Sequence, residues 1–321
     1  MSATDANRRS IARLPLGSCP DSWGVWFADD PLQTPWQRFL DELANVGYEW
    51  LELGPYGYLP TDPAQLSDEL ASRGLSVSGG TMHGHSGLHR AGDWPDILAA
   101  TRRVAGLTAA VGAKHLIFVP VPGYRDDTTG AYLEPAELDD GAWRTLIRAV
   151  NELGKVVSGD YGLRLQFHPH ADSHVETQEQ IERFLTETDP RFVNLCLDTG
   201  HIAYADGDNV QIVERFPERI NYVHLKQVDP AVRERVRQEN LPLSEAVKLG
   251  AMVEPPYGKP DMPPLLDALA ALNRDIYCVV EQDLYPVTPD IPLPIAARTA
   301  GYFAGCGLGP VRRWPYEGSQ A

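Results

Sequence analysis

Eight short runs of β-branched, aromatic and other apolar residues alternate along this chain with longer segments of helical periodicity. Short apolar runs are typical of buried strands, and apolar positions three or four apart form one face of a helix. The strand-like runs are 16–20, 48–53, 75–80, 115–121, 163–168, 193–198, 220–225 and 276–281; the helical segments are 36–47, 63–74, 94–112, 142–162, 177–188 and 263–273.

This alternation predicts an α/β fold with a single (β/α)8 barrel of the TIM type. Strand–helix repetition needs right-handed crossovers, which make the strands parallel, and eight such units in 321 residues match a closed barrel. We expect a flexible tail over 1–13, the barrel over 14–305 and a C-terminal extension over 306–321. An insertion over about 227–262 follows the seventh strand. It is either a lid, a contact in a homo-oligomer, or a surface excursion without a role.

Composition narrows the classes of partner. The formal net charge of −16 disfavours nucleic acid and anionic membrane surfaces, because both would be repelled. No window approaches the roughly 20 apolar residues of a membrane span. The cysteines Cys19, Cys196, Cys278 and Cys306 lie far apart in the sequence. We expect three of them to be buried free thiols, which indicates a reducing, cytoplasmic setting. Small ligands and cations are the expected partners.

Polar residues gather where the predicted strands end, which in such a barrel is the rim that carries the active site. Asp198, His224 and Glu281 each follow a run of apolar strand residues. Carboxylate and imidazole groups that face one another in a partly dry site need compensation, and a divalent cation supplies it. The mixed oxygen and nitrogen set favours Mn²⁺, Co²⁺, Fe²⁺, Zn²⁺ or Mg²⁺ over soft metals. Of these we expect Mn²⁺ or Co²⁺.

A fourth ligand is expected from the fifth strand and the loop that follows it. The candidates are Glu176, Gln166, His168 and His170. A carboxylate best neutralises a divalent ion, which favours Glu176 if its loop folds back over the site; otherwise His168 competes. His168 and His170, with Glu176 and Glu281, are the expected proton-transfer groups, since imidazole titrates near neutral pH. We expect His174 to lie in a solvated loop.

Several other residues at the strand ends have two interpretations. The expected substrate contacts are Trp23, Glu52, His83, His201 and Lys226. Some residues at the strand ends could instead have a structural role. Asp198 could begin a helix with Thr199 and Gly200, and Glu52 could pair with a buried cation. The aromatic residues could either pack in the core or line the barrel mouth: Trp23, Trp26 and Phe27.

Four motifs follow one another along the chain: FHPHADSHVET (167–177), LDTGH (197–201), YVHLK (222–226) and VVEQD (279–283). Their order resembles the xylose isomerase-like barrel family of sugar phosphate isomerases and epimerases, most closely its inosose (2-keto-myo-inositol) dehydratase branch. The resemblance covers about residues 15–300. It implies a divalent metal held at successive strand ends, here by Asp198, His224 and Glu281, acting on a polyhydroxylated ketone or aldehyde, with His201 and Lys226 near the substrate.

Two positions depart from the family pattern. Many members carry a glutamate within strand five, where this chain has Gln166, and the usual Lys-Asp after strand seven is Lys226-Gln227. Support for the ligand histidine is therefore expected from elsewhere in the barrel.

The expected function is a metal-dependent lyase that dehydrates a keto-cyclitol or keto-sugar through an enediolate-like intermediate. The alternatives are an epimerase or isomerase of a keto-sugar, elimination of an aglycone from a 3-keto-glycoside, and a catalytically silent barrel subunit. A metal-dependent DNA-repair nuclease is disfavoured because the chain is acidic.

Overall fold

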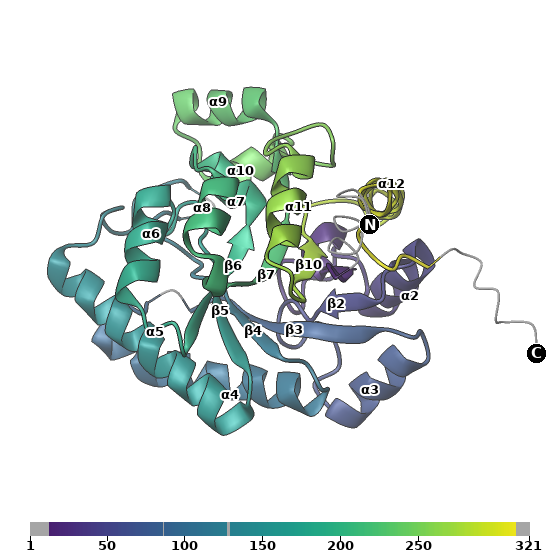
Figure 1. The fold of residues 1–321 in the computed structure, drawn as a ribbon, viewed down its shortest axis with the longest axis horizontal. Helices are drawn as coiled ribbons and strands as arrows, with labels where there is room; N and C mark the ends of the chain where they lie inside the picture. Colours follow the sequence, from purple (N-terminus) through teal and green to yellow (C-terminus); the bar gives the residue numbers. More distant parts are fainter. Residues whose placement is uncertain (1–12, 86, 127–128, 313–321) are drawn as a thin grey trace, which may run out of the picture.

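The eight predicted strands close into one parallel barrel in the computed structural model, which describes residues 13–85, 87–126 and 129–312 (Figure 1). Going round the barrel, the strands are β1 (Leu16–Ser18), β10 (Tyr277–Val280), β7 (Ile220–Leu225), β6 (Val193–Asp198), β5 (Arg164–Phe167), β4 (His115–Phe118), β3 (Ser76–Met82) and β2 (Trp50–Glu52). The predicted fold class is confirmed. The predicted tail over 1–13, apart from Arg13, lies outside the described residues, as do residues 313–321 of the C-terminal extension.

The six predicted helices form, and others appear in addition. The predicted ones are α2 (Trp36–Val46), α3 (Pro63–Ala71), α4 (Trp94–Ala110), α5 (Asp140–Tyr161), α6 (Gln178–Glu187) and α11 (Met262–Ala271). The apolar periodicity did not predict α8 (Asn209–Arg215) and α12 (Pro292–Gly305), and the sequence indicated α7 (Thr199–Tyr204) only as one of two interpretations of Asp198. Helices α7 and α8 are too short for an apolar period to show, and Asp206, in a left-handed conformation (φ 61°), separates them.

The apolar core has two parts that together support the barrel mouth. The larger part lies between the strands and the surrounding helices. A smaller cluster inside the barrel contains Cys19, Ile117, Cys196, Tyr222 and Val279, all fully buried. Cys19, Cys196 and Cys278 are buried free thiols, as predicted. The inner cluster places an apolar floor beneath the rim, and polar groups above it are shielded from water on that side.

The insertion after β7 is a small layer with its own apolar cluster. It contains α9 (Pro230–Glu239) and α10 (Leu243–Lys248), flanked by β8 (Gln227–Val228) and β9 (Met252–Val253), which pair antiparallel. Its cluster includes Ala171 from the loop after β5. Gln282, just after β10, donates through Nε2 to the Met252 carbonyl at 3.1 Å. The insertion is therefore anchored at the carboxyl ends of the strands, and α9 projects outward from there (Figure 1).

Membrane insertion through a helix has no support in the described part of the chain, where no helix is both long and apolar enough to cross a bilayer.

Helix α5 offers a matched test of how closely the helices pack on the barrel. A Cβ added to Gly154 would lie 2.5 Å from the Phe192 carbonyl oxygen, whereas one added to Gly159 would meet nothing within 4 Å. We expect Gly154→Ala to lower the free energy of unfolding by about 1–3 kcal/mol, because the new methyl group would clash with backbone atoms, which cannot move aside as a flexible side chain can. Gly159→Ala should instead raise it by about 0.5–1 kcal/mol. Urea unfolding measures both, and equal effects would contradict the close contact.

Candidate metal centre

Four side chains from adjacent strands converge at the carboxyl end of the barrel. His168 follows β5, Asp198 ends β6, His224 lies in β7 and Glu281 follows β10. The strand register pairs Asp198 with His224, and His224 with Val279, two residues before Glu281. One ligand atom from each of the four lies within 4.8 Å of all the others. The four side chains can therefore share one ion.

The distances between these atoms suit a small cation. His168 Nε2 lies 3.2 Å from Asp198 Oδ2 and 3.7 Å from Glu281 Oε2. His224 Nδ1 lies 3.8 Å from Asp198 Oδ2 and 2.7 Å from Glu281 Oε2. Ligand atoms about 2.0–2.2 Å from a tetrahedral ion are about 3.3–3.6 Å from one another. The observed set spans that separation.

Buried polar atoms without a hydrogen-bond partner point to the same conclusion. His224 Nδ1 and Glu281 Oε2 are both buried and lie 2.7 Å apart, and neither makes a hydrogen bond of good geometry within the described part of the chain, although the Lys226 ammonium lies 2.9 Å from the same Oε2. Buried polar atoms are nearly always hydrogen-bonded. An imidazole lone pair and a carboxylate oxygen that face each other repel, and a positive ion bound between them removes this repulsion. The residues present therefore fit a divalent metal.

The charges at the rim give a second reason for a cation. The carboxyl groups of Glu52, Asp198, Glu281 and Asp283 are all buried, and so is the ammonium of Lys226. Burial would raise the pKa of Glu281, but His224 and Lys226 lower this pKa well below its usual range. Burial likewise opposes ionisation of Asp198, and Lys226 and His168 lower the pKa of this group. Both ligand carboxylates are thus held ionised.

Glu52 orients the ligand His224 from behind. Its Oε2 accepts from Nε2 of His224 at 2.7 Å, and its Oε1 accepts from the Thr81 hydroxyl at 2.5 Å. A proton on Nε2 leaves the lone pair of Nδ1 directed at Asp198 and Glu281. This carboxylate on β2 provides the support that Gln227 does not. The geometry thus favours an orienting role for Glu52 over the expected substrate contact.

The residues of the LDTGH motif that follow its leucine connect the carboxyl ends of β6 and β7. Asp198 uses Oδ1 to accept from the His201 N–H at 2.7 Å, as the N-cap of α7, and its Oδ2 faces the other ligands. Asp198 therefore begins a helix with one oxygen and turns the other toward the remaining members of the group. Thr199 Oγ1 donates to the Lys226 carbonyl at 2.6 Å and accepts from its N–H at 2.8 Å. A Cβ on Gly200 would lie 2.4 Å from Lys226 Cγ, so only glycine leaves room for that side chain.

Lys226 is surrounded by carboxylates from two strand ends, those of β6 and β10. Its Nζ lies 3.2 Å from Asp198 Oδ2, 2.9 Å from Glu281 Oε2 and 3.0 Å from Asp283 Oδ2. Burial opposes its charge, but these carboxylates keep its pKa well above the ordinary value. Burial also raises the pKa of Asp283 to about 6. The sequence pattern showed Asp283 only as one more polar residue at the end of β10, because its pairing with Lys226 depends on the register of two strands.

The remaining candidates for the fourth ligand lie elsewhere. Glu176 is not part of the four-residue group; its Oε2 accepts from the Tyr124 hydroxyl at 2.9 Å. Gln166 is fully buried inside the barrel, where its Nε2 lies 2.9 Å from Nδ1 of His115. His170 packs against His201, with the rings tilted by 38° and their centroids 4.0 Å apart. The geometry brings His168 to the position for which Glu176 was expected, since the loop does not carry the glutamate back over the site.

Of the residues expected to contact the substrate, some lie in the hydrophobic core and others at the mouth of the barrel. Trp23 is fully buried, with its indole N–H donating to Glu42 on α2, and it packs on Phe39. Trp26, Phe27 and His83, together with Tyr56, His85 and Arg103, line a cavity of about 290 Å³ beside the strand ends. Thr81 also lines it, so the cavity adjoins the residue that holds Glu52. His174, expected in solvent, is only 7% exposed because its ring packs against His89 and Tyr124.

Comparison with known proteins gives a consistent result. Residues 40–299 match the family model described as xylose isomerase-like TIM barrel. An inosose dehydratase of Bacillus velezensis is 29% identical over 291 residues, covering 87% of this chain and 94% of that protein. Among solved structures, the probable 3-DHS dehydratase AsbF of Bacillus anthracis has a TM-score of 0.67 at 12% identity, with 91% and 99% of the two chains covered. The IOLI protein, crystallised with a zinc atom, has a TM-score of 0.66 at 13% identity, with 92% and 98% covered.

The contact between Glu52 and His224 predicts a specific loss of metal affinity. We expect Glu52→Gln to weaken Mn²⁺ or Co²⁺ binding by about 10- to 100-fold, because the ring loses the carboxylate that fixes its orientation. Isothermal titration measures the change. Glu42→Gln is the control, since Glu42 is also a buried carboxylate but binds Trp23 and Arg38. The same affinity for wild type and Glu52→Gln would contradict the orienting role.

Glu176 predicts a pH dependence of stability. Burial raises its pKa from 4.5 to about 7, against the opposing Tyr124 hydrogen bond. Between these values the folded state keeps a proton that the unfolded state releases, so this group's contribution to stability falls as pH rises through the window. In urea unfolding, the free energy of unfolding of Glu176→Gln should rise relative to that of wild type by on the order of 1–3 kcal/mol between about pH 5 and about pH 8. Parallel pH profiles for the two proteins would contradict this.

Proposed function

Because the chain belongs to the xylose isomerase-like TIM barrel family, we propose that it is a metal-dependent lyase that dehydrates a keto-cyclitol, of the inosose dehydratase type. Support comes from relatives that match nearly their full length and bear that name. The observation that carries the proposal is the convergence of His168, Asp198, His224 and Glu281, with His224 Nδ1 facing Glu281 Oε2 at 2.7 Å.

The proposed cofactor is one divalent ion, Mn²⁺ or Co²⁺, held by these four residues. When bound, such an ion polarises a ketone and a neighbouring hydroxyl and makes the adjacent C–H acidic. The chain then has two tasks, which are to accept that proton and to protonate the β-hydroxyl as it leaves. The buried free cysteines support a reducing, cytoplasmic setting for this reaction.

His170 is suited to accept the proton. Its Nδ1–H donates to the Ala171 carbonyl at 2.8 Å, which leaves the lone pair on Nε2. Burial, with His168 and Lys226 nearby, lowers its pKa to about 3, so the ring is neutral, and its suitability depends on its position and free lone pair and not on its basicity. A tilted contact with the His201 ring restricts its orientation. A neutral, held imidazole next to the ligand His168 is positioned to take a proton from a substrate carbon.

Lys226 is suited to donate. It is kept protonated beside Asp198, Glu281 and Asp283, and it borders the metal site directly. Asp283 lies 3.0 Å from Nζ and helps to hold the ammonium in place. This assignment changes the expected role of Lys226 from substrate binding alone to binding and proton donation. Glu176 takes no part in it.

Dehydration of 2-keto-myo-inositol tests the proposal. Purified protein with Mn²⁺ or Co²⁺ should produce the absorbance of the dehydrated dione product. Asp198→Asn and Glu281→Gln should each lose activity by more than about 100-fold, since loss of a mere supporting residue costs about 10- to 100-fold. Glu42→Gln should remain active, because it removes a buried carboxylate outside the rim.

The alternatives give different results in the same assay. Solvent deuterium in recovered substrate without dehydration would indicate an epimerase or isomerase of a keto-sugar. Release of aglycone from a 3-keto-glycoside, with inosose unchanged, would indicate the elimination reaction. Wild-type protein that binds no metal, keeps its thermal stability and turns over no keto-sugar would indicate a silent barrel.

A further inference from the structure

A second group of histidine and glutamate side chains lies outside the metal centre, in the loops that follow β3, β4 and β5. His89 Nε2 lies 3.0 Å from Glu134 Oε2, and His174 Nε2 lies 3.0 Å from Glu134 Oε1. One ligand atom from each residue lies within 4.8 Å of the other two. The two imidazole rings are nearly buried, at 8% and 7% exposed, and pack edge to face.

The hydrogen bond that His174 makes through Nδ1 determines which groups its other ring nitrogen, Nε2, can bind. Its Nδ1 lies 3.0 Å from the Ala136 carbonyl oxygen, so Nδ1 carries the proton. In the neutral ring, Nε2 then presents a lone pair to the Glu134 carboxylate, and two acceptors face each other at 3.0 Å. A cation between them removes this conflict. The two candidates are a second proton on the ring and a metal ion.

His89 shows a related pattern. Its Nε2 lies 3.2 Å from Arg90 Nη1, which can only donate, and 3.0 Å from Glu134 Oε2, which can only accept. Its Nδ1 is buried without a hydrogen-bond partner among the described residues. In the tautomer with the proton on Nδ1, the lone pairs of both imidazoles and one carboxylate point at a common region. That set of groups is typical of a zinc site with two histidines and one glutamate.

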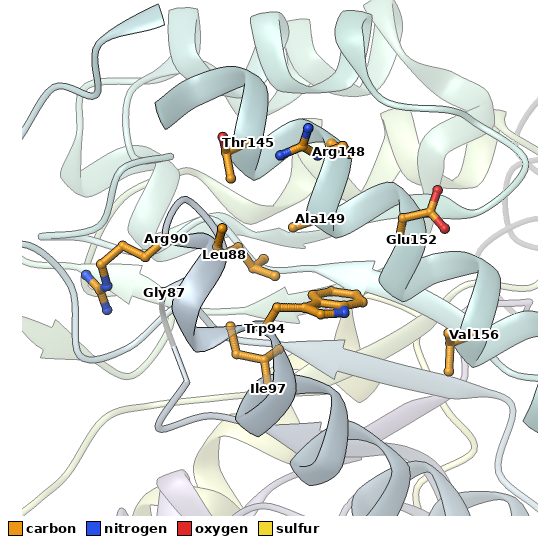
Figure 2. A pocket seen from close by; sticks show the side chains of 11 residues that line it. Gly87, Leu88, Arg90, Trp94, Ile97, Thr145, Arg148, Ala149, Glu152 and Val156 are labelled. Atoms are coloured by element: carbon orange, nitrogen blue, oxygen red, sulfur yellow. The ribbon is translucent and has the colours of Figure 1, made fainter. Parts of the chain in front are cut away.

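The Arg90 head group now provides the positive charge at this region. Its Nη1 lies 3.0 Å and 3.1 Å from the two Glu134 oxygens. The Arg90 side chain is 46% exposed and also pairs with Asp93 at 2.7 Å. It borders a groove of about 350 Å³ between α4 and α5, and Figure 2 shows it at the edge, directed away from Trp94. The guanidinium therefore has both an alternative partner and space to move.

We propose that His89, Glu134 and His174 form a second divalent-cation site, of the zinc class, in which the metal replaces the Arg90 guanidinium between the three ligands. The site would join three loops at the mouth of the barrel, and one of them also carries His168 and His170. Its role is to hold that loop in place. The inference does not depend on which reaction the barrel centre performs.

The test requires a background in which the barrel centre no longer binds metal. Asp198→Asn and Glu281→Gln remove both carboxylate ligands there, and His224→Gln is added because His168, Cys196 and His224 could hold an ion by themselves. After chelator treatment, this protein is titrated with Zn²⁺ by calorimetry and with Co²⁺ by visible absorption. We expect one equivalent to bind with the absorption of a tetrahedral histidine and carboxylate site. Adding Glu134→Gln should abolish it. No binding in the background protein, or unchanged binding after Glu134→Gln, would overturn the proposal.

Arg90→Ala in the same background distinguishes a metal site from a purely structural ion-pair cluster. If the guanidinium competes with the metal, its removal should tighten Zn²⁺ binding by about tenfold or more. Because Arg90 is largely exposed, this variant should stay folded even if Glu134→Gln does not, and circular dichroism checks both. Zn²⁺ affinity that is unchanged or weaker in Arg90→Ala would show that the cluster is held by arginine and protonated histidine instead, which overturns the proposal.

Discussion

The buried negative charge at the barrel mouth is the constraint on which the site depends. Glu52, Asp198, Glu281 and Asp283 are buried above an apolar floor, with Lys226 among them. An ionised carboxylate in such a place is costly unless a cation compensates it. Lys226 meets part of this requirement, and a divalent ion held with the help of His224 and His168 would meet the rest. The same charge balance explains why a divalent ion fits and why Lys226 stays protonated.

The barrel rim uses single residues for more than one task. Asp198 caps α7 with one oxygen and faces the ligands with the other, so the start of a helix and a ligand are one feature. Thr199 and Gly200 fix the backbone and the space of Lys226. These contacts link the ends of β6 and β7, and a change to any of them alters both the local helix and the charge next to the substrate position.

Two groups of histidines lie along one loop, and they differ in their surroundings. His168 and His170 lie beside the barrel centre, where carboxylates from other strands face them. His174 points the other way, toward Glu134 and His89. The short loop from β5 to α6 thus connects the proposed metal centre with the proposed second cation site. Tyr124 extends this connection, because it contacts both His174 and Glu176.

The sequence by itself determined the barrel, its eight strands, six of its helices and three of the four convergent residues. Strand and helix periods are local properties, and parallel strands bring their carboxyl ends to one rim, so Asp198, His224 and Glu281 could be placed together without coordinates. The tertiary structure decided what depends on the path of a loop or on contacts across the barrel. It selected His168 over Glu176, placed Glu52 behind His224, and buried His174. No period in the sequence encodes these, because side chains in irregular loops are positioned by neighbours far away in the chain.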